Sequence, residues 1–221
     1  WTKRETREKI NQTIEQTLLF ALIFSVPSSV GIYALSEQII SVLFERGEFD
    51  NESTLNTSKA LKFYSIGLIA FIVMKIYTPI FFAYENAKPT LYVTAINLIF
   101  NTSLSIVLFI YIGFTGIALA TSISAWLSIL VMYYFLEKNN YYKITKSTTF
   151  PIMVVILSSI GMYFYLILLK KNSILFLHFF YSNEIIFLLF SVLSSILLYL
   201  ILISFYKPFK FAHITKILKN E

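Results

Sequence analysis

Six long apolar stretches fill most of this 221-residue chain, and they carry almost no charge. They are Thr17–Leu35, Phe63–Tyr84, Leu91–Ile112, Phe114–Leu136, Phe150–Leu169 and Ile185–Tyr206. Each is about as long as the roughly 20 residues that a helix needs to cross the apolar core of a bilayer. Because that core offers no water to unpaired backbone groups, such segments must be helical. The sequence therefore predicts an all-α fold, a polytopic membrane helix bundle with six transmembrane helices.

Charge is distributed unevenly between the two sides that six alternating helices create. Residues 1–16, 137–149 and 207–221 are basic, whereas Ser36–Ser58 carries five acidic residues against one arginine. Basic loops stay on the cytoplasmic side of a membrane. We therefore predict a cytoplasmic basic segment (1–16), a cytoplasmic linker (137–149) and a cytoplasmic basic tail (207–221), with both termini in the cytoplasm. The exceptions are Lys59, Lys62, Lys170 and Lys171.

The remaining composition argues against other classes of function. The net charge of +6 is accounted for by loop residues beside anionic lipid heads, so we expect no nucleic-acid partner. The chain has no cysteine and two histidines, and it lacks P-loop, GxGxxG and HExxH motifs. We interpret Glu45, Glu48 and Asp50 as a solvated loop face rather than a metal or acid–base site. We expect no metal, no cofactor and no enzymatic activity.

One charged residue lies inside an apolar stretch. A lysine at the centre of a membrane helix costs about 3 kcal/mol on insertion scales, so Lys75 needs a partner, a wet cavity or a route to the interface. Two interpretations stay open: its long stem carries the ammonium to the interface, or the cation faces a cavity that handles an anionic group. Pro79, one turn later, removes a backbone donor and predicts a kink.

The third stretch carries a polar stripe of Thr94, Asn97, Asn101 and Ser105, whose spacing places them on one helical face. Such residues normally form hydrogen bonds with a neighbouring helix. We favour this packing role for Asn97 and Asn101, and we retain both as candidate substrate-binding residues.

The last two stretches differ from the first four. They follow the polar loop 137–149 and are apolar on all sides, which suits contact with lipid or with another apolar chain. Their small or polar interior residues include Ser158, Gly161, Ser191 and Ser195.

The acidic loop contains a short amphipathic pattern. Glu37–Arg46 has apolar residues at helical spacing, and Gly47 is a natural helix stop. The segment is either a separate helix at the outer interface or an extension of the first stretch, and the same alternatives hold for Ser173–Tyr181.

Four strings of the sequence stand out together. They begin at Leu43 (LFERGEFD), Ala60 (AL, then YSIGL), Lys75 (KI, then PIFFA and KPT) and Gly116 (GIALATS). In order and spacing over residues 17–138 these strings resemble the MurJ (MviN) family of lipid II flippases, and the last two stretches match that family in length and position. The first string contains the family's outer-loop signature residues Glu45, Arg46, Gly47 and Asp50.

The resemblance implies a transporter. Members of this family have fourteen transmembrane helices and move the undecaprenyl-linked peptidoglycan precursor across the bacterial cytoplasmic (inner) membrane. This chain resembles helices nine to fourteen, with 17–136 as the four-helix part of the second lobe. Because the chain begins at Trp1 and not at methionine, we expect further helices upstream, including those that carry the cationic cavity's arginines.

The resemblance also implies a role for residues 150–206. The family's final two helices form an apolar groove for the lipid tail, so Ser158, Gly161, Ser191 and Ser195 become candidate groove residues, and we expect Leu193 to face the groove. The lipid-linked precursor and membrane lipids are the implied partners.

Three other interpretations compete with a lipid II flippase that works by alternating access. One is an exporter of another lipid-linked glycan or a drug from the same superfamily, against which the outer-loop signature argues. Another is a non-transporting six-helix membrane scaffold, favoured by the missing cavity helices. The third is a membrane-embedded transferase, but Glu85 and Glu137 lie near the cytoplasmic face without catalytic neighbours.

Overall fold

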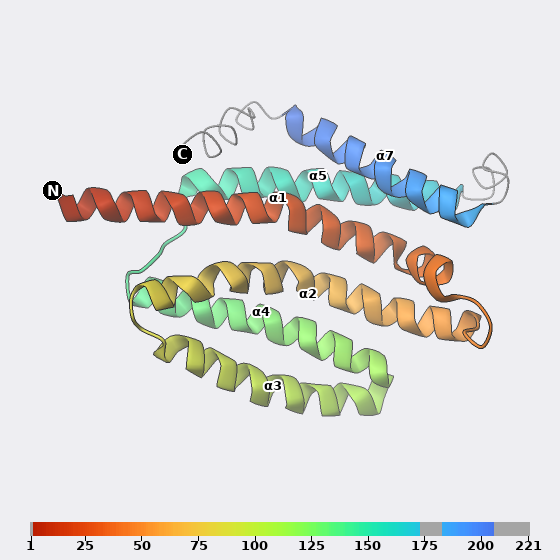
Figure 1. Ribbon diagram of the computed structural model, residues 1–221, viewed down its shortest axis with the longest axis horizontal. Coiled ribbons are helices and arrows are strands. Elements are labelled where there is room, and N and C mark those ends of the chain that lie inside the picture. Colours follow the sequence, from red (N-terminus) through yellow and green to blue (C-terminus); the bar gives the residue numbers. More distant parts are fainter. Residues whose placement is uncertain (1, 173–182, 206–221) are drawn as a thin grey trace.

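The chain folds into long helices that pack side by side (Figure 1). A computed structural model describes residues 2–172 and 183–205, and these form helices and no strands. The helices are α1 (Thr2–Phe44), α2 (Asn51–Ala83), α3 (Lys88–Ile112), α4 (Phe114–Lys138), α5 (Lys146–Lys171) and α7 (Glu184–Ser204). Each of the six is long and apolar enough to cross a membrane. The predicted all-α membrane bundle with six transmembrane helices is confirmed.

The helices run further than the apolar stretches. α1 is continuous from Thr2 to Phe44, so the Glu37–Arg46 segment extends the first stretch rather than forming a separate helix. α5 begins at Lys146 and contains Pro151 beyond its first turn, where the proline has no N–H to donate to the Ser147 carbonyl. The segment Ser173–Tyr181 lies outside the described residues.

α1 lies at the centre of the arrangement. It packs against α2 on one side and against α5 and α7 on the other, while α2 packs on α4 and α4 on α3. Figure 1 shows α7 and α3 on opposite sides of α1. α1 therefore packs against α2 on one side and against the pair formed by α5 and α7 on the other.

The linker between α4 and α5 is attached to α1 and to the end of α2. The Glu15 carboxylate of α1 accepts hydrogen bonds from the Thr145 backbone N–H (2.9 Å) and hydroxyl (3.1 Å). The Tyr141 ring stacks on that of Tyr84 with centroids 4.1 Å apart. We call this end of the bundle the linker end, and the end with the α1–α2 connection the loop end.

Small residues allow α1 and α4 to approach α2 closely. The Ser122 hydroxyl of α4 donates to the Phe63 carbonyl of α2 (2.6 Å), and the Ser29 hydroxyl of α1 donates to the Ser65 carbonyl (2.6 Å). A Cβ on Gly67 would lie 2.6 Å from the Ser122 Oγ. Hydrogen bonds and small-residue contacts of this kind replace the hydrophobic effect as the cause of helix association in a bilayer.

Gly116 provides the sharpest test of this packing. A Cβ at Gly116 of α4 would lie 2.5 Å from the backbone carbon and oxygen of Leu108 in α3, whereas a Cβ at Gly31 would meet the Met162 Cε at an ordinary 3.9 Å. We expect Gly116→Ala to destabilise the protein by about 1–3 kcal/mol, because backbone must move. Gly31→Ala is the control and should stay within about 0.5 kcal/mol of the parent. Thermal unfolding in detergent measures both, and equal midpoints would contradict the close α3–α4 contact.

Candidate functional site

A long apolar groove lies between α1 and α7. Its volume is about 650 Å³, and its lining comes from α1, α7 and Met162 of α5. On α1 the lining extends from Ile23 to Ile39, roughly 24 Å at the helical rise of 1.5 Å per residue. This is most of the roughly 30 Å thickness of a bilayer core.

The groove lies beside the expected helix pair rather than inside it. α5 and α7 pack closely, since a Cβ on Gly161 would lie 2.9 Å from the Leu202 Cδ1. Ser158 and Ser191 are buried, with 6% and 1% of their surfaces exposed, and like Gly161 they do not line the groove. Ser195 does line it.

The sequence predicts that Leu193 faces the lipid-tail groove, and this prediction is wrong for the groove between α1 and α7. The Leu193 side chain is 61% exposed and does not line that groove. Val192 and Ile196 of α7, which precede and follow Leu193 in the sequence, do line the groove.

Two serine hydroxyls of the groove lining are paired within α7. Ser195 donates to the Val192 carbonyl (2.8 Å) and Ser204 donates to the Ile201 carbonyl (2.8 Å). The other contributors are mainly Ile, Leu, Val, Phe and Pro side chains. The groove therefore suits an apolar chain and offers little to a charged head group.

Lys75 is exposed on the surface of α2. It forms no hydrogen bond or ion pair with any residue that the structure describes. Pro79 has no N–H to donate to the Lys75 carbonyl. Lys75 thus carries both an ammonium and a backbone carbonyl that lacks its usual helical donor. Both groups favour a polar environment, which the membrane interface and a wet cavity each provide.

Asn97 and Asn101 are half-buried on α3, whose main partner is α4. The Ser105 hydroxyl donates to the Asn101 Oδ1 (3.2 Å). The opposite face of α3 is exposed and apolar at residues such as Ile99 and Ile110. This placement favours the packing role. The two asparagines do not line the groove, and Figure 1 shows α3 on the far side of α1 from α7.

The first signature residues end α1 and turn the chain. The Arg46 guanidinium donates to the Leu43 carbonyl (2.8 Å), which pairs one of the carbonyls at the end of the helix. Gly47 has φ +60°, a left-handed conformation that favours glycine. α1 ends at Phe44, three residues before Gly47, where the sequence predicts its stop.

The other signature residues begin α2. Asp50 is the N-cap, and its Oδ1 accepts from the Ser53 backbone N–H (2.9 Å). The Glu45 Oε2 accepts from the Thr54 hydroxyl (3.1 Å) and joins the two ends of the loop. Hydrogen bonds from Ser53 hold the pKa of Asp50 below its ordinary value.

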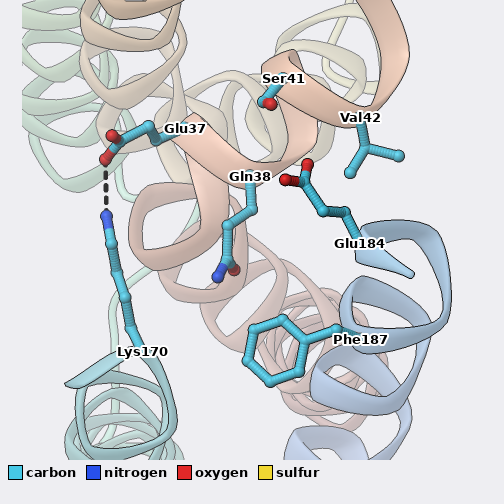
Figure 2. A pocket seen from close by; sticks show the side chains of 7 residues that line it. All are labelled: Glu37, Gln38, Ser41, Val42, Lys170, Glu184 and Phe187. Atoms are coloured by element: carbon cyan, nitrogen blue, oxygen red, sulfur yellow. Dashed lines mark hydrogen bonds and ion pairs between the residues drawn. The ribbon is translucent and has the colours of Figure 1, made fainter. Parts of the chain in front are cut away.

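A smaller hollow of about 180 Å³ lies at the loop end (Figure 2). Lys170 of α5 forms an ion pair with Glu37 of α1, with 2.6 Å between Nζ and Oε2. Gln38 of α1 and Glu184 of α7 line the same hollow. The ion pair holds α5 to α1 at the end of the bundle where the groove also ends.

Comparison with known proteins identifies the family. The family model for lipid II flippase MurJ matches residues 2–186. The chain belongs to the MurJ family. A probable lipid II flippase MurJ from Rickettsia prowazekii (strain Madrid E) is 38% identical over 119 residues, which are 54% of this chain and 24% of that protein. One from Buchnera aphidicola subsp. Acyrthosiphon pisum (strain APS) is 31% identical over 160 residues, 72% of this chain and 31% of that protein.

A solved structure agrees with this assignment. The structure described as lipid II flippase MurJ in an inward closed conformation has a TM-score of 0.73 and 30% identity to this chain. The match covers 91% of this chain and 40% of that one. Measured against the MurJ relatives, the chain spans about a quarter to a third of their length.

Sequence reasoning missed two features of this MurJ-family chain. The groove wall on α1 was not predicted, although Phe24, Ser28 and Leu35 share one helical face. The Glu37–Lys170 ion pair is not predicted either. The sequence places opposite charges at the outer ends of the first and fifth spans, but the packing of these two spans comes from the structure.

The signature loop of this MurJ-family chain gives a pH-dependent prediction. Asp50→Ala should lower the melting temperature by a few degrees at neutral pH, because the start of α2 loses its cap. A depressed carboxyl pKa stabilises the fold above the ordinary aspartate pKa, and the stabilisation is lost as the pH falls through the native value. The difference from the parent should therefore shrink in acid. Glu48→Ala, in the same exposed loop, is the control, and a pH-independent effect of Asp50→Ala would contradict the cap.

Proposed function

We propose that this chain is the C-terminal part of a lipid II flippase, which moves the undecaprenyl-linked peptidoglycan precursor across the cytoplasmic membrane by alternating access. The match to the MurJ family over residues 2–186 carries the proposal. The relatives are described as probable lipid II flippases, which supports the same substrate.

The groove between α1 and α7 is the proposed site of the lipid tail. A tail that enters it exchanges contacts with lipid for contacts with protein, so there is little hydrophobic gain. The benefit is alignment: a tail held along α1 keeps the head group at a fixed position relative to the bundle. The apolar lining of about 650 Å³ supports this role.

Lys75 is the proposed contact for an anionic group of the substrate. Moving a diphosphate through hydrocarbon is prohibitively costly, so the head group needs a wet cavity with positive charge. The exposed ammonium of Lys75 and the carbonyl that Pro79 leaves open both favour a polar environment over lipid. Lys75 assists, whereas the family's main cavity arginines belong to helices that precede this region.

The linker end is the proposed cytoplasmic side. Lys9, Lys88, Lys138 and Lys143 lie in or beside the ends of helices there, while the loop end carries Glu45, Glu48 and Asp50. Basic residues remain in the cytoplasm, so both termini of this chain face it.

The direct test is transport by the full-length gene product. The purified protein is placed in vesicles with fluorescent lipid II, and the lipid that becomes accessible on the other leaflet is measured. We expect transfer that depends on the protein, together with growth of a bacterium depleted of its own flippase. Transfer of a different lipid-linked glycan without lipid II would contradict the proposed substrate, and no transfer of either would contradict transport.

A further inference from the structure

One interhelical hydrogen bond in the groove lining involves a proline. Pro27 lies inside α1, and a proline cannot donate to the carbonyl four residues before it, here that of Ile23. The Tyr199 hydroxyl of α7 donates to this Ile23 carbonyl at 2.8 Å. A side chain from the opposite wall of the groove thus fills the vacancy that Pro27 creates in the helical hydrogen bonding.

The position of the bond links it to the groove. Ile23, Pro27 and Tyr199 all line the groove, so the bond joins its two walls. Tyr199 is only 4% exposed, which excludes the common role of a tyrosine anchored at a membrane surface. Figure 1 shows α1 changing direction part-way along its length.

The second interior proline gives a useful contrast. Pro79 of α2 leaves the Lys75 carbonyl without its usual donor, and no described side chain from another helix donates to it. Lys75 and Pro79 are exposed, whereas Pro27 is half-buried and lines the apolar groove. An unpaired carbonyl among apolar side chains is costly, so the Ile23 carbonyl favours the arrangement in which Tyr199 reaches it.

We propose that Tyr199 is a positioning residue of the groove. Its hydroxyl holds α7 on the carbonyl that Pro27 leaves open in α1, and this bond fixes the separation of the two groove walls towards the linker end. The role in transport rests on the proposed function of the groove as the site of the lipid tail. The pairing itself depends only on Tyr199, Ile23 and Pro27.

Four proteins test the pairing: the parent, Tyr199→Phe, Pro27→Ala and the double variant. Tyr199→Phe removes one oxygen and leaves the Ile23 carbonyl unpaired. Pro27→Ala restores a backbone N–H that can pair with that carbonyl, so the hydroxyl is then dispensable. Tyr163→Phe is the control, because no described residue forms a hydrogen bond with the Tyr163 hydroxyl.

The readout is the distance between spin labels on the outer surfaces of the two walls. The chain contains no cysteine, so Phe20→Cys in α1 and Leu197→Cys in α7 give defined label positions in a full-length protein freed of other cysteines. Both side chains are exposed and neither lines the groove. The labelled proteins are measured in lipid nanodiscs.

We expect Tyr199→Phe to raise the population with separated walls roughly threefold to twentyfold, the range for interhelical hydrogen bonds in membranes. In the Pro27→Ala background the same change should have little further effect. An unchanged distance distribution in Tyr199→Phe would overturn the proposal, as would an equal shift with and without Pro27.

Transport of lipid II by the same variants separates this proposal from the function of the groove. Separated walls with unchanged transport would support the positioning role and contradict the lipid-tail role. Unchanged walls with reduced transport would overturn the positioning role and leave the groove proposal standing.

Discussion

Ile196→Trp should abolish growth of cells that depend on the full-length protein, whereas Leu193→Trp should be tolerated. Ile196 lines the groove between α1 and α7, so the indole fills space that the proposed lipid tail needs. Leu193 is on the same helix, is 61% exposed and does not line the groove, so there the indole displaces only lipid. Growth of a flippase-depleted strain at matched protein levels measures the difference.

The opposite wall of the groove allows a graded version of the same test. Gly31 of α1 lines the groove, and a methyl group there meets only the Met162 Cε at 3.9 Å. Gly31→Ala should therefore retain transport, while Gly31→Leu and Gly31→Phe should lose it progressively as the groove fills. If Ile196→Trp and Gly31→Phe both transport lipid II at the parental rate, the groove does not hold the tail.

The contrast between Ile196 and Leu193 shows why the sequence could predict the helices but not the groove. Apolar length alone fixes which segments span a membrane, because every backbone group must pair within the helix. Which apolar face meets lipid and which meets another helix depends on packing, and both kinds of face consist of the same residues. The groove wall on α1 is therefore indistinguishable from a lipid-facing surface until α7 is placed beside it.

Local chemistry was easier to predict than long-range contacts. Gly47 predicted the end of α1 to within three residues, because a left-handed residue after a helix favours glycine. The stripe of Asn97 and Asn101 predicted a common face, but α4 as the partner came from the structure. The contact of Glu15 with Thr145 joins residues 130 positions apart, and nothing in the local sequence of either indicates the other.

Lys75→Met should reduce transport of lipid II by about tenfold or more, while the amount of inserted protein stays the same or rises. If the ammonium contacts an anionic group of the substrate, its removal costs about 1.5–3 kcal/mol, the range for a charge-assisted hydrogen bond. Insertion of α2 into the membrane becomes easier, since a lysine at the centre of a membrane helix raises the free energy of insertion by about 3 kcal/mol. Flux per protein in lipid vesicles, with insertion measured separately, distinguishes the two effects.

Lys59→Met is the matched control, because Lys59 is also exposed on α2 but lies near its start at the loop end. Lys75→Arg should retain part of the transport, since it keeps the charge. Parental flux in Lys75→Met would mean that the ammonium extends to the interface and serves only the stability of α2 in the membrane. Loss in Lys75→Met with retention in Lys75→Arg and Lys59→Met would instead place a required positive charge on the exposed face of α2, beside the carbonyl that Pro79 leaves open.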